Sequence, residues 1–241
     1  MSFLIYNAFF LLERVQIGTS QHLFPILIAV LFCTWFIPYA KRKLNKLQQE
    51  RVLHFFACCI SLTVLVFHLH KISLGSYKLK TDLPLYLCSL MGLVIPVFTY
   101  FKKYWMYEIL VFWIIAGTLQ GVITPDAPLG FPSFDYFRYW VVHLGLLIII
   151  FYATFVFKMQ PKFKSVFKSF FALQLYIILM VATNYILNAN YFYLNKKPQS
   201  ASILDYFGEW PSYIIVSKLI IMPYFLLIYF PFYIFKRKKA A

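Results

Sequence analysis

Two side chains, one thiol and one imidazole, lie inside apolar stretches at similar distances from where those stretches begin. Cys88 follows Asp82 in the run Asp82-Leu-Pro-Leu-Tyr-Leu-Cys-Ser89, and His143 follows Tyr136 at a similar spacing. At about 1.5 Å per helical residue, both lie roughly 9–10 Å inside a membrane if both helices enter from the same side. A thiol beside a base is the minimum needed for acyl transfer through a covalent intermediate. Cys88 and His143 are therefore the predicted catalytic pair.

Other polar side chains fall near the same predicted depth. An unpartnered polar group in hydrocarbon costs free energy, so each needs a reason to be there. We expect Gln120 or an asparagine to donate a hydrogen bond to the oxyanion of a tetrahedral intermediate. We expect Lys218, with Lys196 and Lys197, to hold a phosphate. The predicted oxyanion and substrate-binding residues are Gln120, Asn184, Asn188, Lys218, His22 and His68.

Each of these residues also has a purely structural interpretation. A cysteine in an apolar helix often acts as a small hydrophobic residue. Glutamine and asparagine often join neighbouring helices by hydrogen bonds, and a lysine can extend to the membrane surface. For Cys88 the sequence leaves the catalytic and the packing interpretations open.

The histidines do not predict a metal site. His68 and His70 occupy positions i and i+2, which point to different faces of a helix. The sequence has no His-Glu-x-x-His pattern, and its cysteines form neither a Cys-x-x-Cys pair nor a loop framework for disulfides. We expect no metal and no other cofactor.

Composition places the chain in the membrane. Of its 241 residues, 62% are hydrophobic, 22% are aromatic and only 13% are charged. A soluble domain has nearly twice that share of charged residues, so a membrane protein is predicted. The net charge of +15 does not indicate nucleic acid, because the basic residues form short clusters between apolar stretches. We also expect no detachable signal peptide, because the apolar stretch 3–12 is followed by Glu13 and Arg14.

Continuously apolar runs of about 20 residues predict an all-α polytopic membrane protein with seven transmembrane helices. The runs form one transmembrane domain over residues 1–241. Strands are not expected, because polar and apolar residues do not alternate. The predicted spans are 22–39, 52–70, 82–101, 104–124, 136–157, 167–189 and 211–235.

Lysine and arginine predict the orientation. They concentrate at 41–51, 102–103, 158–168 and 236–239, which an odd number of spans places on one side of the membrane. Most acidic residues fall on the other side. Because basic loops stay in the cytoplasm, the N-terminus is predicted outside and the C-terminus cytoplasmic.

The order of several short motifs resembles the YwaF family of bacterial integral membrane proteins. The motifs that carry the resemblance are Leu83-Pro-Leu-Tyr-Leu-Cys88, Ala116-Gly-Thr-Leu-Gln120, Gly130-Phe-Pro-Ser133, His143-x-Gly145, Asn184-Tyr and Trp210-Pro-x-Tyr213. That family is similar to an animal acyltransferase that remodels ether phospholipids, and distantly to membrane hydrolases of fatty-acid esters of hydroxy fatty acids. The resemblance implies a bacterial plasma membrane location, a phospholipid or lysophospholipid substrate, and catalytic roles for Cys88 and His143.

The sequence thus predicts a membrane-embedded acyltransferase or acyl hydrolase acting on phospholipid esters in the outer leaflet. One alternative is a seven-helix transporter of small solutes, which would carry polar residues at the membrane midplane and internal similarity between its halves. Another is a non-enzymatic structural protein whose polar residues only join helices. A lipid-sized opening beside Cys88 would indicate the enzyme. A polar path to both faces would indicate the transporter, and a dry interior would indicate the structural protein.

Overall fold

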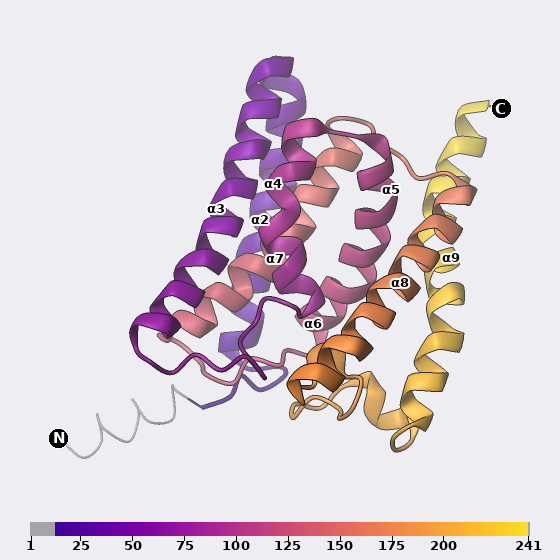
Figure 1. Cartoon of the computed structure of the whole chain (residues 1–241). Helices are drawn as coiled ribbons and strands as arrows, with labels where there is room; N and C mark the ends of the chain where they lie inside the picture. Colours follow the sequence, from indigo (N-terminus) through magenta and orange to yellow (C-terminus); the bar gives the residue numbers. More distant parts are fainter. Residues whose placement is uncertain (1–12, 241) are drawn as a thin grey trace.

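The computed structural model describes residues 13–240, with side chains up to Lys236. Within this part the chain is helical and contains no strand, which confirms the all-α part of the prediction (Figure 1). The elements are α2 (Ser20–Lys43), α3 (Lys46–Ser73), α4 (Leu87–Phe101), α5 (Tyr104–Trp113), η1 (Ile114–Thr118), α6 (Leu119–Ile123), α7 (Phe134–Phe155), α8 (Phe163–Leu187), η2 (Tyr191–Tyr193), η3 (Ile203–Phe207) and α9 (Ser212–Ala240).

Six helices in this part are long and apolar enough to cross a membrane. They are α2, α3, the continuous Tyr104–Ile123 segment, α7, α8 and α9. The seventh apolar helix, α4, has 15 residues and is shorter than a full crossing requires. The chain is a multi-pass membrane protein, with α4 as a shorter helix in place of the third predicted span.

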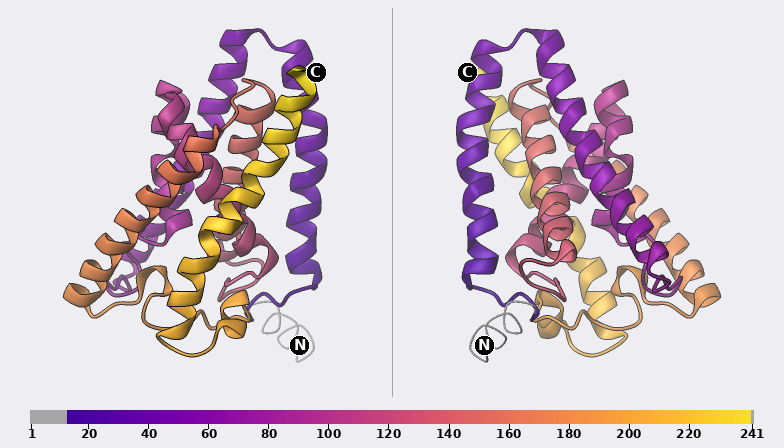
Figure 2. Two further views of the ribbon diagram at one scale, coloured as in Figure 1. Left: turned by 90° about the vertical axis from the view of Figure 1, so that its right-hand side faces the viewer. Right: turned by 90° about the vertical axis from the view of Figure 1, so that its left-hand side faces the viewer.

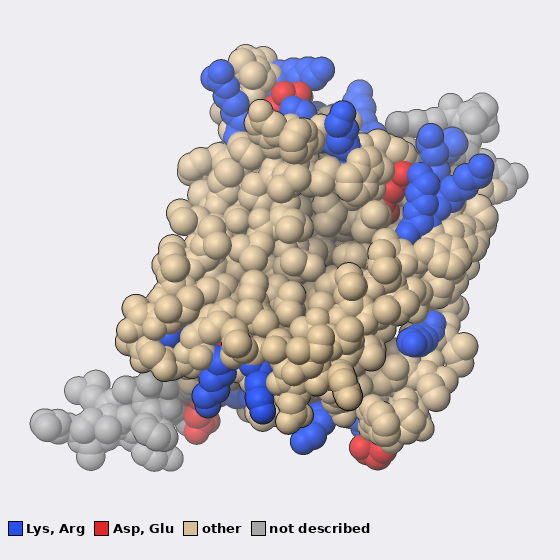
Figure 3. Space-filling view, viewed as in Figure 1, with Lys and Arg blue, Asp and Glu red and all other residues tan. Residues whose placement is uncertain are grey.

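The helices alternate in direction, so the connections fall at two ends of the bundle (Figures 1 and 2). The short-loop end contains the connections 44–45, 102–103 and 156–162, and the long-loop end contains 74–86, 124–133 and 188–211. Helix α2 begins at the long-loop end and α9 ends at the other (Figure 1). Basic side chains gather at both ends, with a broad, mostly uncharged band between them (Figure 3).

Helix α7 lies at the centre and packs against α2, α3, α4 and η1. Its contact with α3 is close because Gly145 has no side chain. A Cβ at Gly145 would lie 2.7 Å from Cδ1 of Ile60 on α3. Small residues of this kind let membrane helices approach closely. The outer helices, by contrast, present large apolar side chains outward, such as Phe171 on α8 and Leu219 on α9. Such a surface requires lipid around it.

Candidate active site

Cys88 lies in the first turn of α4, because the helix begins only at Leu87. The preceding segment forms a tight turn in which the Leu85 N–H donates to the Leu83 carbonyl at 2.7 Å. Pro84 disfavours helical backbone at the residue before it, which delays the start of the helix. The predicted helical depth of Cys88, counted from Asp82, is therefore wrong. The thiol therefore lies at the start of a helix and not about two turns inside one.

Thr118 is the polar neighbour of this thiol. Its Oγ1 lies 3.6 Å from Sγ of Cys88, and the residue is fully buried. Thr118 ends η1, a π-helical segment that interrupts the span Tyr104–Ile123. Segments of this kind widen the helix by one residue and are frequent at functional sites. The π-segment brings this hydroxyl to the start of α4.

The hydrogen bonds of His143 fix which nitrogen carries the proton. Its Nδ1 lies 2.7 Å from the backbone carbonyl of Tyr139, one turn earlier on α7. A carbonyl oxygen only accepts, so Nδ1 must donate, and a neutral ring then has its lone pair on Nε2. The Tyr139 ring stacks on the imidazole with centroids 4.0 Å apart. The ring is therefore oriented with Nε2 as the basic atom.

A cavity of about 800 Å³ brings together most of the predicted site residues. Cys88, His143, Gln120, Lys218 and His68 all line it, although they come from five different helices. Its lining extends from the loops of the long-loop end to about the middle of the helices, as far as Ala116 and Leu173. The volume is that of a typical small-molecule site.

Three predicted residues do not line the cavity. His22 is buried and bridges two segments: Nδ1 accepts from the Gly18 N–H at 2.9 Å, and Nε2 donates to the Val122 carbonyl at 2.8 Å. Asn184 holds the backbone of Tyr191 through both polar atoms of its amide, at 2.9 and 2.7 Å. Asn188 ends α8 in the left-handed conformation with φ of 49°. In this structure each has a local structural role.

The cavity also contains polar residues that the sequence did not single out. Gln174 of α8 and Ser202 beside η3 both line it. Within the described part of the protein, Nε2 of Gln174, Oγ of Ser202 and both ring nitrogens of His68 are buried without a hydrogen-bond partner. Buried polar atoms normally have partners, so these atoms indicate a polar ligand or water. Gln174 was missed because it lies alone in the apolar middle of its span.

Hydrogen bonds join the loops at the mouth of the cavity. Asp126 accepts from Arg14, from Ser200 Oγ at 3.0 Å and from Tyr193 Oη at 2.7 Å. Burial and the Asp126 carboxylate together raise the pKa of Tyr193, so its hydroxyl stays protonated as the donor. This network joins the N-terminal segment to the loops 124–133 and 188–211.

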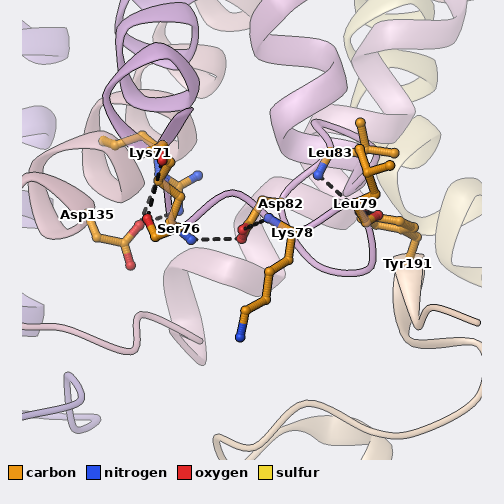
Figure 4. A network of polar contacts seen from close by, with 9 residues as sticks. Lys71, Ser76, Lys78, Leu79, Asp82, Leu83, Asp135 and Tyr191 are labelled. Carbon is orange, nitrogen blue, oxygen red and sulfur yellow. Dashed lines mark hydrogen bonds and ion pairs between the residues drawn. The ribbon is translucent and has the colours of Figure 1, made fainter. Parts of the chain in front are cut away.

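A second network holds the loop 74–86, as Figure 4 shows. Asp82 accepts from Lys71 Nζ at 2.7 Å and from the Lys78 N–H at 2.8 Å. The Tyr191 hydroxyl accepts from the Leu83 N–H at 3.0 Å and donates to the Leu79 carbonyl at 2.6 Å. Burial alone would raise the pKa of the Asp82 carboxyl. Two effects outweigh burial: the hydrogen bond and charge of Lys71, and the hydrogen bond from the Lys78 N–H. Together they hold the pKa of Asp82 below its ordinary value of 3.8.

The basic residues of the cavity differ in their ion pairing. Arg14, Lys71, Arg138 and Lys197 each pair with a carboxylate. Within residues 13–236, Lys196 and Lys218 also line the cavity and have no carboxylate partner. Two ammonium groups are thus available to an anion. The described residues contain no cluster of three or more His, Cys, Asp or Glu side chains that could hold a metal ion.

Comparison with known proteins corrects the expected family. Searches of curated proteins and of solved structures gave no match. The model of the TMEM164 family, however, matches residues 17–229, which is most of the chain. The prediction of the YwaF family is therefore wrong. The location in a bacterial plasma membrane was inferred from that resemblance, so it no longer has this support. The chain belongs to the TMEM164 family.

Proposed function

We propose that this protein is a membrane-embedded acyltransferase that acts on phospholipid esters through Cys88 and His143. One observation carries the proposal: the thiol and an imidazole whose basic nitrogen is defined line the same cavity. The cavity is large enough for a glycerol ester group with the beginnings of its chains. It lies among helices with lipid-facing apolar surfaces, which supports a lipid as the substrate.

In the first half-reaction, Nε2 of His143 takes the Cys88 proton as Sγ attacks the ester carbonyl of the donor lipid. The unpaired Nε2 of Gln174 donates to the oxyanion, with Gln120 as a second donor. The intermediate collapses to a Cys88 thioester, and the lysolipid leaves with the proton held by His143. The Thr118 hydroxyl donates to Sγ while it is anionic.

In the second half-reaction the order is reversed. His143 removes the proton from the hydroxyl of an acceptor lysolipid, and that oxygen attacks the thioester. The new ester leaves, and the proton returns to Sγ of Cys88. Water in place of the lysolipid would give hydrolysis. Lys196 and Lys218, which have no carboxylate partner in the described part, hold the phosphate.

The shape of the cavity favours this function over a carrier. Among the described residues, none of the segments 44–45, 102–103 and 156–162 contributes to the lining. A carrier needs access from both faces of the membrane, with its site near the midplane. A cavity confined to the long-loop half suits a reaction within one leaflet.

We also propose that the long-loop end faces outward, with the N-terminus outside and the C-terminus cytoplasmic. The basic clusters at the short-loop end support this orientation. Short epitope tags at the two termini test it in sealed cells. Protease should remove the N-terminal tag and spare the C-terminal one, and the opposite pattern would reverse the assignment.

The acyltransferase is tested with purified protein, a phospholipid carrying an isotopically labelled acyl chain, and a lysophospholipid acceptor. Cys88→Ala should abolish transfer, and His143→Gln should slow it by about 10²-fold or more. Cys33→Ala, on α2, is the matched control and should leave the rate unchanged. Full activity in Cys88→Ala would rule out the proposal.

Thr118 provides a finer test of the site. Thr118→Val keeps the shape and removes the hydroxyl, and should slow transfer about tenfold, the value of one hydrogen bond. Thr118→Ser should restore most of the rate. If valine and serine behave alike, the hydroxyl has no role in the reaction.

A further inference from the structure

A second cysteine–histidine pair lies on α3, away from the cavity. Sγ of Cys58 is 3.6 Å from Nε2 of His54, one helical turn earlier. Nδ1 of His54 is 2.9 Å from Oγ1 of Thr99 on α4. Neither Cys58 nor His54 lines the cavity at the long-loop end. Thr99 lies two residues before the end of α4, so this cluster is close to the short-loop end.

The hydrogen bonds of this cluster define which atom donates and which accepts in each contact. The Thr99 hydroxyl donates to the Pro96 carbonyl at 3.1 Å, so toward His54 its oxygen can only accept. Nδ1 of His54 must therefore carry the proton. In a neutral imidazole this leaves the lone pair on Nε2, which faces the thiol of Cys58. The arrangement is that of a nucleophile, a base and a group that orients the base.

The thiol is open to the surrounding lipid. Cys58 is exposed. Phe55 is 64% exposed and Leu62 is 59% exposed, and these residues precede and follow Cys58 by three and four positions on the same face. Arg51, three residues before His54, is also exposed and extends this face toward the short-loop end. An apolar strip with a thiol within it and a cation at its polar end fits a fatty acyl chain with an anionic carrier.

We propose that Cys58 is a site of S-acylation, with a long-chain acyl-coenzyme A as the donor. His54 Nε2 takes the thiol proton, and Sγ attacks the thioester carbonyl of the donor. A new carbon–sulfur bond forms at Cys58, the bond to coenzyme A breaks, and the coenzyme A thiolate takes the proton from His54. The acyl chain lies along Phe55 and Leu62, and Arg51 faces the phosphates of the donor. This inference does not depend on the proposed acyltransferase activity.

The experiment uses the purified full chain in detergent micelles with an alkyne-labelled palmitoyl-coenzyme A. All variants carry Cys88→Ala, so that a thioester at the cavity cannot contribute. Hydroxylamine-sensitive label should appear on Cys58, as located by mass spectrometry. Cys58→Ala should remove it, whereas Cys59→Ala should keep it. Cys59 is the matched control, because it is adjacent and exposed, and the described part of the chain shows no imidazole beside it.

His54→Gln should slow labelling of Cys58 by about 10²-fold. Thr99→Val should slow it less, and Thr99→Ser should restore it, which separates positioning from general loss of fold. Size-exclusion profiles matching the parent protein exclude misfolding. Equal labelling of Cys58 and Cys59, or an unchanged rate in folded His54→Gln, would overturn the proposal.

Discussion

Gly121 of α6 lies directly against the ring of His143. A Cβ at Gly121 would be 2.8 Å from Nε2 and 2.7 Å from Cδ2 of that ring. Atoms cannot remain this close, so a side chain here would displace the imidazole. The hydroxyl of Tyr139, whose ring stacks on His143, donates to the Gly121 carbonyl at 2.6 Å. The glycine thus provides both the space for the imidazole and an acceptor for the tyrosine that supports it.

Gly121→Ala should therefore reduce acyl transfer by about 10²-fold, because a shift of about 1 Å in a catalytic group has this effect. Gly145→Ala is the matched control. It creates a similar clash, 2.7 Å from Ile60 Cδ1, outside the cavity lining. Gly145→Ala should lower the melting temperature with little change in the rate per folded molecule. Equal rates in the two variants would contradict the placement of His143.

The ion pair of Asp82 should make the loop 74–86 sensitive to acid. The folded pKa lies below the ordinary 3.8, so the stabilisation is complete above 3.8 and is lost as the pH falls through the folded pKa. Asp82→Asn should cost about 1–2 kcal/mol near neutral pH. Thermal unfolding of both proteins across pH should show the difference between them shrinking in acid. A difference that stays constant below 3.8 would contradict the assignment.

Tyr191 should hold the same loop over the cavity. Tyr191→Phe removes the hydroxyl that accepts from Leu83 and donates to Leu79, and leaves those backbone groups without this partner. We expect a loss of about 1–2 kcal/mol and faster tryptic cleavage after Lys78 and Lys80. Tyr206→Phe is the control, because that side chain is 88% exposed. Unchanged cleavage in Tyr191→Phe would show that the hydroxyl does not hold the loop.

A buried carboxylate joins α5 to α8 near the short-loop end. Glu108 is 2% exposed and accepts from Ser165 Oγ at 2.6 Å and from Lys168 Nζ at 2.8 Å. Glu108→Ala should cost about 2 kcal/mol because it leaves the buried Ser165 hydroxyl without its acceptor. Glu108→Gln should cost about 1 kcal/mol, since its amide oxygen still accepts.

Lys168→Met serves as the partner variant to Glu108→Ala. The Lys168 side chain is 56% exposed, but its loss leaves the buried Glu108 carboxylate without its counter-charge. Lys168→Met should therefore cost about 3 kcal/mol, more than Glu108→Ala. Denaturation of the purified protein in mixed micelles compares the variants. A smaller effect from Lys168→Met than from Glu108→Gln would show that the buried carboxylate does not depend on this lysine.

The family resemblance shows one limit of sequence motifs. The motifs around Cys88, Gln120 and His143 predicted a family of membrane proteins with this order of polar residues. The chain instead matches the model of the TMEM164 family. Short motifs in a given order identify a kind of architecture more readily than a particular family.

The sequence by itself determined that this is a helical membrane protein. Long apolar runs with few charges can satisfy their backbone in lipid only as helices, whatever their neighbours. Spacing alone also singled out Cys88, His143, Gln120 and Lys218, because they fall at similar distances from the ends of their apolar runs. It did not single out Gln174, Thr118 or Gly121, whose roles depend on what lies opposite them.

Only the tertiary structure decided how these side chains meet. The turn at Pro84 moves Cys88 to the start of α4, and the π-segment places Thr118 beside its thiol. His22 resembled a site residue in sequence, but both its ring nitrogens bond to backbone groups. Hydropathy fixes which segments enter the membrane, since it depends on each segment alone. The direction of a side chain depends on packing between segments distant in sequence, and that information appears only when the helices are assembled.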